Sequence, residues 1–218
     1  MTARRTLLAA AAGAGLLPGP AVASPPAETP RHALSKLLDG NERWVQGRPR
    51  HRDPADDRRR RTAGGQNPFA VIFSCIDSRV PPEIVFDQDL GDLFVVRTAG
   101  QVIDPLIAGS IEYGPAHGTP LVMVLGHTGC GAVKATIESF ADGKLPPGNI
   151  AAVVHALAPA YFAARPQPSS PLGEQILAVV RAQVTRTVVQ LRADPLLTNA
   201  LVVGAVYDLR SGQVSRIA

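Results

Sequence analysis

Both cysteines of the chain lie in short polar segments that could bind a metal ion. One segment is Cys75-Ile-Asp77-Ser-Arg79, and the other is His127-Thr-Gly-Cys130. Zinc takes thiolate and imidazole ligands, and catalytic zinc sites use three protein ligands and leave a fourth position open. Cys75, His127 and Cys130 supply three such ligands, while Asp77 could reach the fourth position or pair with Arg79 instead. The pattern favours a catalytic zinc site over a structural one.

A disulfide between the two cysteines is the alternative. An oxidising compartment would permit a Cys75–Cys130 bridge. A plain structural disulfide, however, has no need of a histidine three residues before Cys130, nor of Asp77 and Arg79 beside Cys75. These neighbours favour the metal site.

Four short apolar runs predict the strands that would position these residues. Near-continuous apolar strands separated by helix-length segments are typical of a parallel sheet covered on both faces. The sequence therefore predicts an α/β fold: a mainly parallel β-sheet flanked by helices, with a helical arm at the N-terminal side. The expected strands are 69–73, 93–96, 121–125 and 201–206, and the expected helices are 32–46, 107–113, 132–140, 151–164 and 174–192.

The expected strand ends place the two polar segments at one edge of the sheet. Cys75 would lie just beyond the first strand and His127 just beyond the third, with Cys130 in the loop that opens the next helix. Ligands of open α/β sheets bind outside the carboxyl ends of the strands. Two distant parts of the chain could thus converge on one metal.

The N-terminal region has the pattern of an export signal. Arg4 and Arg5 precede an apolar run at 7–17, which is too short to span a bilayer, and Ala21-Val-Ala23 resembles a cleavage site. We expect a signal peptide at 1–23 of the twin-arginine type, the alternative being an ordinary secretory signal. The protein would be periplasmic or extracellular, with a linker and helical arm at 24–62 and a catalytic α/β domain at 63–218.

Composition gives little support for a nucleic-acid or membrane partner. The formal net charge is +4, and only 18% of the residues are charged. Aspartates lie close to the arginine run at 58–61, which is typical of a solvent-exposed surface. The segment 47–65 has no periodic pattern of apolar residues and is expected to be an arm or loop. We expect no nucleic-acid partner and no membrane span in the mature protein.

The chain resembles the β-class carbonic anhydrases over residues 34–217. The resemblance extends well beyond the ligand-type residues, and its segments occur in the family's order. They are Cys-Ile-Asp-Ser-Arg-Val at 75–80, Gly-Asp-Leu-Phe-Val-Val-Arg-Thr-Ala-Gly at 91–100, Ser-Ile-Glu-Tyr at 110–113, Gly-His-Thr-Gly-Cys-Gly-Ala-Val at 126–133 and Gly-Ala-Val-Tyr-Asp-Leu at 204–209.

The resemblance implies a β-carbonic anhydrase fold and reversible hydration of carbon dioxide to bicarbonate. Zn²⁺ bound by Cys75, His127 and Cys130 would lower the pKa of its water to roughly 7, and the zinc-bound hydroxide would attack carbon dioxide. Asp77 would accept a hydrogen bond from that hydroxide while Arg79 holds the carboxylate off the metal. In a closed state, Asp77 would be the fourth zinc ligand.

Further positions match the substrate pocket of the family, which is built at a dimer interface. The resemblance therefore implies a homodimer or a higher homo-oligomer. The matching residues are Gln66, Phe94, Ala99 and Tyr113, and Gly129 is expected in a tight turn or close to substrate. Without the resemblance, core packing would be the preferred role of Phe94 and Tyr113.

One position departs from the allosteric members of the family. Those members bind bicarbonate at a noncatalytic pocket that uses a tryptophan, an arginine and a tyrosine. Arg97 and Tyr207 match two of these positions, but Ile72 stands at the third and cannot donate an indole N–H hydrogen bond. We therefore expect no regulatory pocket and an open zinc site.

Two alternatives remain for the function. A carbonyl sulfide or carbon disulfide hydrolase of the same fold would use the same metal chemistry on another linear triatomic molecule. A non-catalytic zinc-binding relative would need neither Asp77 nor Arg79.

Overall fold

The computed structural model describes residues 28–50 and 55–218. The predicted signal peptide at 1–23 lies outside the described residues. Within the described ranges, no helix is long and apolar enough to cross a membrane.

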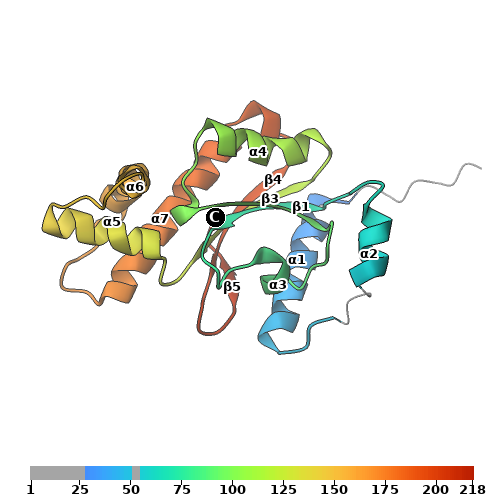
Figure 1. Ribbon diagram of the computed structural model, residues 1–218, viewed down its shortest axis with the longest axis horizontal. Coiled ribbons are helices and arrows are strands. Elements are labelled where there is room, and N and C mark those ends of the chain that lie inside the picture. Colours follow the sequence, from blue (N-terminus) through green and yellow to red (C-terminus); the bar gives the residue numbers. More distant parts are fainter. Residues whose placement is uncertain (1–27, 51–54) are drawn as a thin grey trace, which may run out of the picture.

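A five-stranded sheet in the order β2-β1-β3-β4-β5 forms the centre of the molecule (Figure 1). The first four strands are parallel, and β5 runs antiparallel to β4. The strands are β1 (Ala70–Cys75), β2 (Leu93–Thr98), β3 (Leu121–His127), β4 (Leu201–Tyr207) and β5 (Val214–Arg216). The mainly parallel α/β fold is therefore confirmed, with β5 as a strand that the sequence did not predict.

Helices cover both faces of the sheet, as continuous burial of β1 and β3 requires. One apolar core joins the sheet to α4, α5, α6 and α7, and a second joins the opposite face to α1 and α3. The helices are α1 (Pro30–Val45), α2 (Ala55–Thr62), α3 (Pro82–Val85), α4 (Pro105–Ala116), α5 (Gly131–Asp142), α6 (Ile150–Ala164) and α7 (Leu172–Arg192), with short 3-10 turns at η1 (Ala99–Gln101) and η2 (Pro195–Leu197).

The segment 47–65, expected to be an arm or loop, contains the helix α2 over part of its length. This helix has no apolar face, and tertiary hydrogen bonds anchor it instead. Arg58 donates from Nε to the carbonyl of Leu90 at 2.7 Å and from Nη2 to Asp92 at 2.5 Å. The sequence of α2 therefore lacks the periodic apolar residues from which a helix is usually predicted.

Local capping explains where two of the helices begin. The Thr29 side chain accepts a hydrogen bond from the backbone N–H of His32 at the start of α1, and Asp104 accepts from the N–H of Ile107 at the start of α4. Each cap is followed directly by proline, whose fixed φ suits the first turn of a helix.

Candidate metal centre

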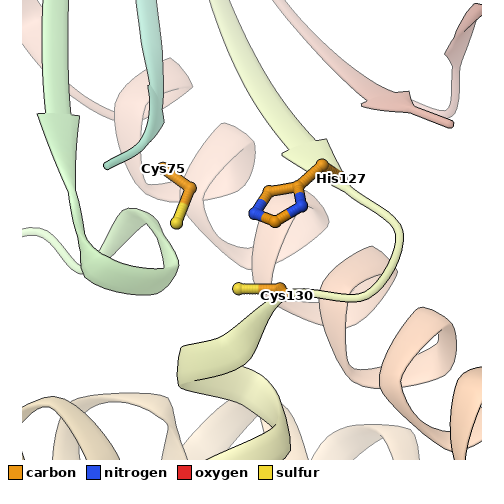
Figure 2. Close-up of side chains that lie close together, drawn as sticks. All are labelled: Cys75, His127 and Cys130. Carbon is orange, nitrogen blue, oxygen red and sulfur yellow. The ribbon is translucent and has the colours of Figure 1, made fainter. Parts of the chain in front are cut away.

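Two strand ends and one helix start bring Cys75, His127 and Cys130 together. Cys75 is the last residue of β1, His127 is the last residue of β3, and Cys130 is the N-cap of α5. The sequence predicted Cys75 and His127 just beyond the ends of their strands, whereas both are the last residues of those strands. Cys130, expected in the loop, caps the start of the helix. Their ligand atoms all lie within 4.8 Å of one another, the three residues are buried, and the side chains point toward a common space (Figure 2).

The hydrogen bonding of His127 leaves one ring nitrogen free for a metal. Its Nδ1 lies 2.9 Å from the carbonyl oxygen of Thr128. Because a carbonyl can only accept, Nδ1 must carry the proton, which leaves a lone pair on Nε2. Nε2 is fully buried and has no hydrogen-bond partner among the described residues. A buried unpaired acceptor that faces two thiols fits a metal ligand.

The two cysteines are free thiols, so the structure contains no Cys75–Cys130 disulfide. A hydrogen bond between the two side chains lowers the pKa of Cys75 to about 4 and raises the pKa of Cys130. The backbone N–H of Gly100 also donates to Cys75 Sγ, at 3.4 Å. Metal ions bind cysteine as the thiolate, so the lowered pKa suits Cys75 as a ligand, and the set of two cysteines and one histidine is of the type that binds Zn²⁺.

Arg79 holds the carboxylate of Asp77 beside the three ligands. Its Nε donates to Oδ1 at 2.9 Å and its Nη2 to Oδ2 at 2.7 Å, and its backbone N–H also donates to Oδ1, at 3.0 Å. Hydrogen bonding from the Arg79 side chain lowers the pKa of Asp77 to about 2, which keeps the carboxylate ionised at neutral pH. Asp77 Oδ2 lies 3.9 Å from His127 Nε2.

Gly129 forms the turn between His127 and Cys130. Its φ is +66°, in the left-handed region that glycine adopts without steric cost. The turn allows the chain to pass from the end of β3 to the start of α5 within three residues. The carbonyl of Gly129 lies 3.5 Å from Arg79 Nη2, which adds a contact between the two polar segments.

A mainly apolar cavity of about 370 Å³ opens beside the ligands. Asp77 and Cys75 contribute to its wall, while the opposite wall comes from α5 and α6. Its remaining lining is Ile76, Ala99, Gly131, Ala132, Ala135, Ile150, Val153 and Val154. Ala99 thus lines the cavity beside the ligands.

The structure places Gln66, Phe94 and Tyr113 away from this cavity within one chain. Gln66 is exposed and lines a separate hollow with the end of α2. The rings of Phe94 and Tyr113 meet edge to face at 5.7 Å between centroids, and both line a hollow beside β2 with Leu106.

Arg97 has a role beside the metal centre that the sequence did not predict. Its Nε donates to the carbonyl of Cys75 at 2.8 Å and its Nη2 to the carbonyl of Asp77 at 2.5 Å. It therefore ties the polar segment after β1 to β2.

Ile72 and Tyr207, the other two positions that were compared with the allosteric pocket of the family, also make contacts inside the protein. Ile72 is fully buried in the core. The hydroxyl of Tyr207 accepts a hydrogen bond from the indole Nε1 of Trp44, at 3.2 Å.

Comparisons with known proteins agree with this geometry. The family model described as carbonic anhydrase matches residues 70–214. The chain is 42% identical over 196 residues to carbonic anhydrase 2 of Mycobacterium tuberculosis, covering 86% of this chain and 93% of the relative. It is also 42% identical over 198 residues to a carbonic anhydrase of Mycolicibacterium smegmatis, covering 87% and 94% of the two chains.

Solved structures share the fold. The β-carbonic anhydrase of Coccomyxa, solved with acetazolamide, has a TM-score of 0.66 and 25% identity, and the match covers 84% of this chain and 86% of that one. A tetrameric β-carbonic anhydrase of Sordaria macrospora has a TM-score of 0.67 and 20% identity, covering 85% and 96%. The ligand cluster, the fold and these relatives together establish that the chain is an enzyme of the β-carbonic anhydrase family.

Proposed function

We propose that the protein is a zinc-dependent carbonic anhydrase that hydrates carbon dioxide reversibly. The observation that carries the proposal is the buried cluster of Cys75, His127 and Cys130, in which the Nε2 lone pair of His127 has no partner. Zn²⁺ in a site with two thiolates and one imidazole supplies a nucleophile from water near neutral pH.

The residues around the cluster have separate tasks in this reaction. Arg79 keeps the Asp77 carboxylate ionised and oriented toward the ligands. Oδ2 of Asp77 can then accept a hydrogen bond from the reacting group. This hydrogen bond fixes the orientation of that group, and such orientation lowers the barrier of the reaction. The apolar wall of the 370 Å³ cavity suits a small molecule without charge and limits the entry of water.

A rate assay on metal-replete protein tests the substrate. We expect faster turnover of carbon dioxide than of carbonyl sulfide or carbon disulfide, and loss of activity together with zinc in His127→Gln. The matched control is His155→Gln, because His155 is an exposed histidine on α6. Faster turnover of carbonyl sulfide or carbon disulfide would assign the protein to the hydrolases, and zinc binding without turnover would make it a non-catalytic relative.

We also propose that the enzyme works as a homodimer or a larger homo-oligomer. β2 is one of the two edge strands of the sheet, and the side chain of Leu106 beside it is 82% exposed. Pairing at this edge would bury the hollow lined by Phe94 and Tyr113 and could carry Gln66 of one copy toward the cavity of the other. Sedimentation of the wild type and of Leu106→Glu tests the proposal: the variant should dissociate, and a monomeric wild type would contradict it.

For the N-terminal region we propose export by the twin-arginine route. The support is the sequence alone, namely Arg4 and Arg5, the apolar run at 7–17 and Ala21-Val-Ala23. The mature protein should begin at Ser24 in the exported fraction, as determined by N-terminal sequencing. Replacement of Arg4 and Arg5 by lysine should block export, whereas unchanged export would indicate an ordinary secretory signal.

A further inference from the structure

The sulfur of Cys75 receives a backbone hydrogen bond that depends on a single turn. The donor is the N–H of Gly100, 3.4 Å from Sγ, and Gly100 is buried. Hydrogen bonds to a metal-binding group orient it and tune the charge that it donates to the metal. The position of this N–H therefore bears directly on the first ligand of the proposed zinc site.

The turn that presents the N–H contains two consecutive residues in the left-handed region. Gly100 has φ +64° and Gln101 has φ +52°. The first is explained by glycine, since a Cβ at Gly100 would also lie 2.9 Å from Leu157 Cδ1. The second is unusual, because left-handed backbone is uncommon for glutamine and persists only where the surroundings hold it.

Two hydrogen bonds hold Gln101 in this conformation. Its side-chain Nε2 donates to the carbonyl of Leu125 on β3, and Gln183 of α7 donates from Nε2 to the carbonyl of Gln101 at 3.1 Å. Gln101 is only 2% exposed, so these contacts are made without competition from water.

The contact with Leu125 occurs where strand pairing stops. The β1–β3 ladder ends at the pair Ser74–Leu125, one residue before Cys75 and two before His127. Beyond that point no strand pairing fixes the end of β1 relative to the end of β3. Gln101 spans this gap, since its amide binds β3 while its neighbour Gly100 binds Cys75 Sγ.

We propose that Gln101 is a positioning residue for the metal centre: it holds the Gly100 N–H on the sulfur of Cys75 and fixes that sulfur relative to His127. Gln183 on α7 donates a hydrogen bond to the carbonyl of Gln101, so hydrogen bonds connect α7 through η1 to Cys75. The inference rests on the proposed zinc site and adds to it a residue that is neither one of the three ligands nor part of the cavity lining.

The test compares glutamine-to-methionine variants, which keep length but remove the amide. In Gln101→Met we expect metal affinity, measured by chelator competition, to fall roughly 10–100-fold. In the cobalt-substituted protein the thiolate-to-cobalt charge-transfer band should move to longer wavelength, because a sulfur that has lost its N–H donor holds its electrons less tightly. Gln183→Met should change both quantities in the same direction, by a smaller amount.

Gln190→Met is the matched control, since Gln190 is an exposed glutamine on the same helix as Gln183. A merely structural role would lower the melting temperature of the variants but leave the charge-transfer band in place, and that result would overturn the proposal. If Gln101→Met does not fold, an unchanged band and affinity in Gln183→Met would overturn it equally. A wild type without metal would instead contradict the zinc site itself, and this inference with it.

Discussion

Asp77 and Arg79 form a two-point ion pair directly beside the three ligands. The guanidinium contacts both carboxylate oxygens, at 2.9 and 2.7 Å, and Asp77 Oδ2 remains 3.9 Å from His127 Nε2. The arginine side chain is more than half exposed, whereas the aspartate is mostly covered. The main effect of the Asp77–Arg79 pair is therefore to orient the carboxylate, because exposed ion pairs contribute little to the free energy of folding.

Loss of this orientation should reduce catalysis more than metal binding. Asp77→Asn should lower kcat/KM for carbon dioxide hydration by about 10²-fold or more, because an amide has no charge and only one acceptor oxygen, so it cannot hold the two-point contact with Arg79 and orient the reacting group. Arg79→Lys should retain only part of the activity, because lysine cannot form the two-point contact. The assay uses protein of verified zinc content, with the exposed Arg181→Lys as control. Full activity in Asp77→Asn would contradict the role assigned to the carboxylate.

The same pair predicts the titration of Asp77. Its pKa is lowered from the usual 3.8 to about 2, chiefly by hydrogen bonding from Arg79. A lowered folded-state pKa means that the pair stabilises the fold above pH 3.8 and that this contribution is lost as the pH falls through 2. Carboxyl-carbon NMR should give a midpoint near 2 in the wild type and a higher midpoint in Arg79→Gln. Equal midpoints in the two proteins would rule out Arg79 as the cause.

The glycines on either side of Cys130 should respond in opposite ways to alanine. Gly129→Ala places a Cβ on a left-handed residue and should cost about 1–2 kcal/mol in the free energy of unfolding. Gly131 begins α5 with open space around its Cβ position, so Gly131→Ala should be neutral or stabilising by up to about 1 kcal/mol. Urea unfolding at fixed protein concentration measures both. Equal effects would show that the Gly129 turn carries no backbone requirement.

The sequence predicted the ligands and the sheet because each has a local signature. Thiol and imidazole types at the ends of apolar runs indicated where the metal centre would form, and the structure brings Cys75, His127 and Cys130 together. The Gly100–Gln101 turn has no such signature, since the left-handed glutamine is held by contacts from β3 and α7 that only the fold creates. α2 was missed for a similar reason, because hydrogen bonds from Arg58 rather than an apolar face hold it.

Gly40 shows the same dependence on the fold within a helix. Glycine is a poor helix former, yet α1 continues through Gly40. A Cβ at this position would lie 1.8 Å from the carbonyl oxygen of Phe86, so glycine is what lets the helix approach the segment after α3.

Gly40→Ala should therefore destabilise the protein although alanine is the better helix former. The alanine Cβ would displace backbone, and overpacking of this kind costs about 1–3 kcal/mol. Gly173→Ala is the control, since Gly173 lies in α7 with nothing within 4 Å of its Cβ position, and the gain there should be about 0.5–1 kcal/mol. Urea unfolding at equal protein concentration compares the two variants with the wild type. A Gly40→Ala protein as stable as the wild type would mean that α1 can move away from Phe86 without loss of core packing.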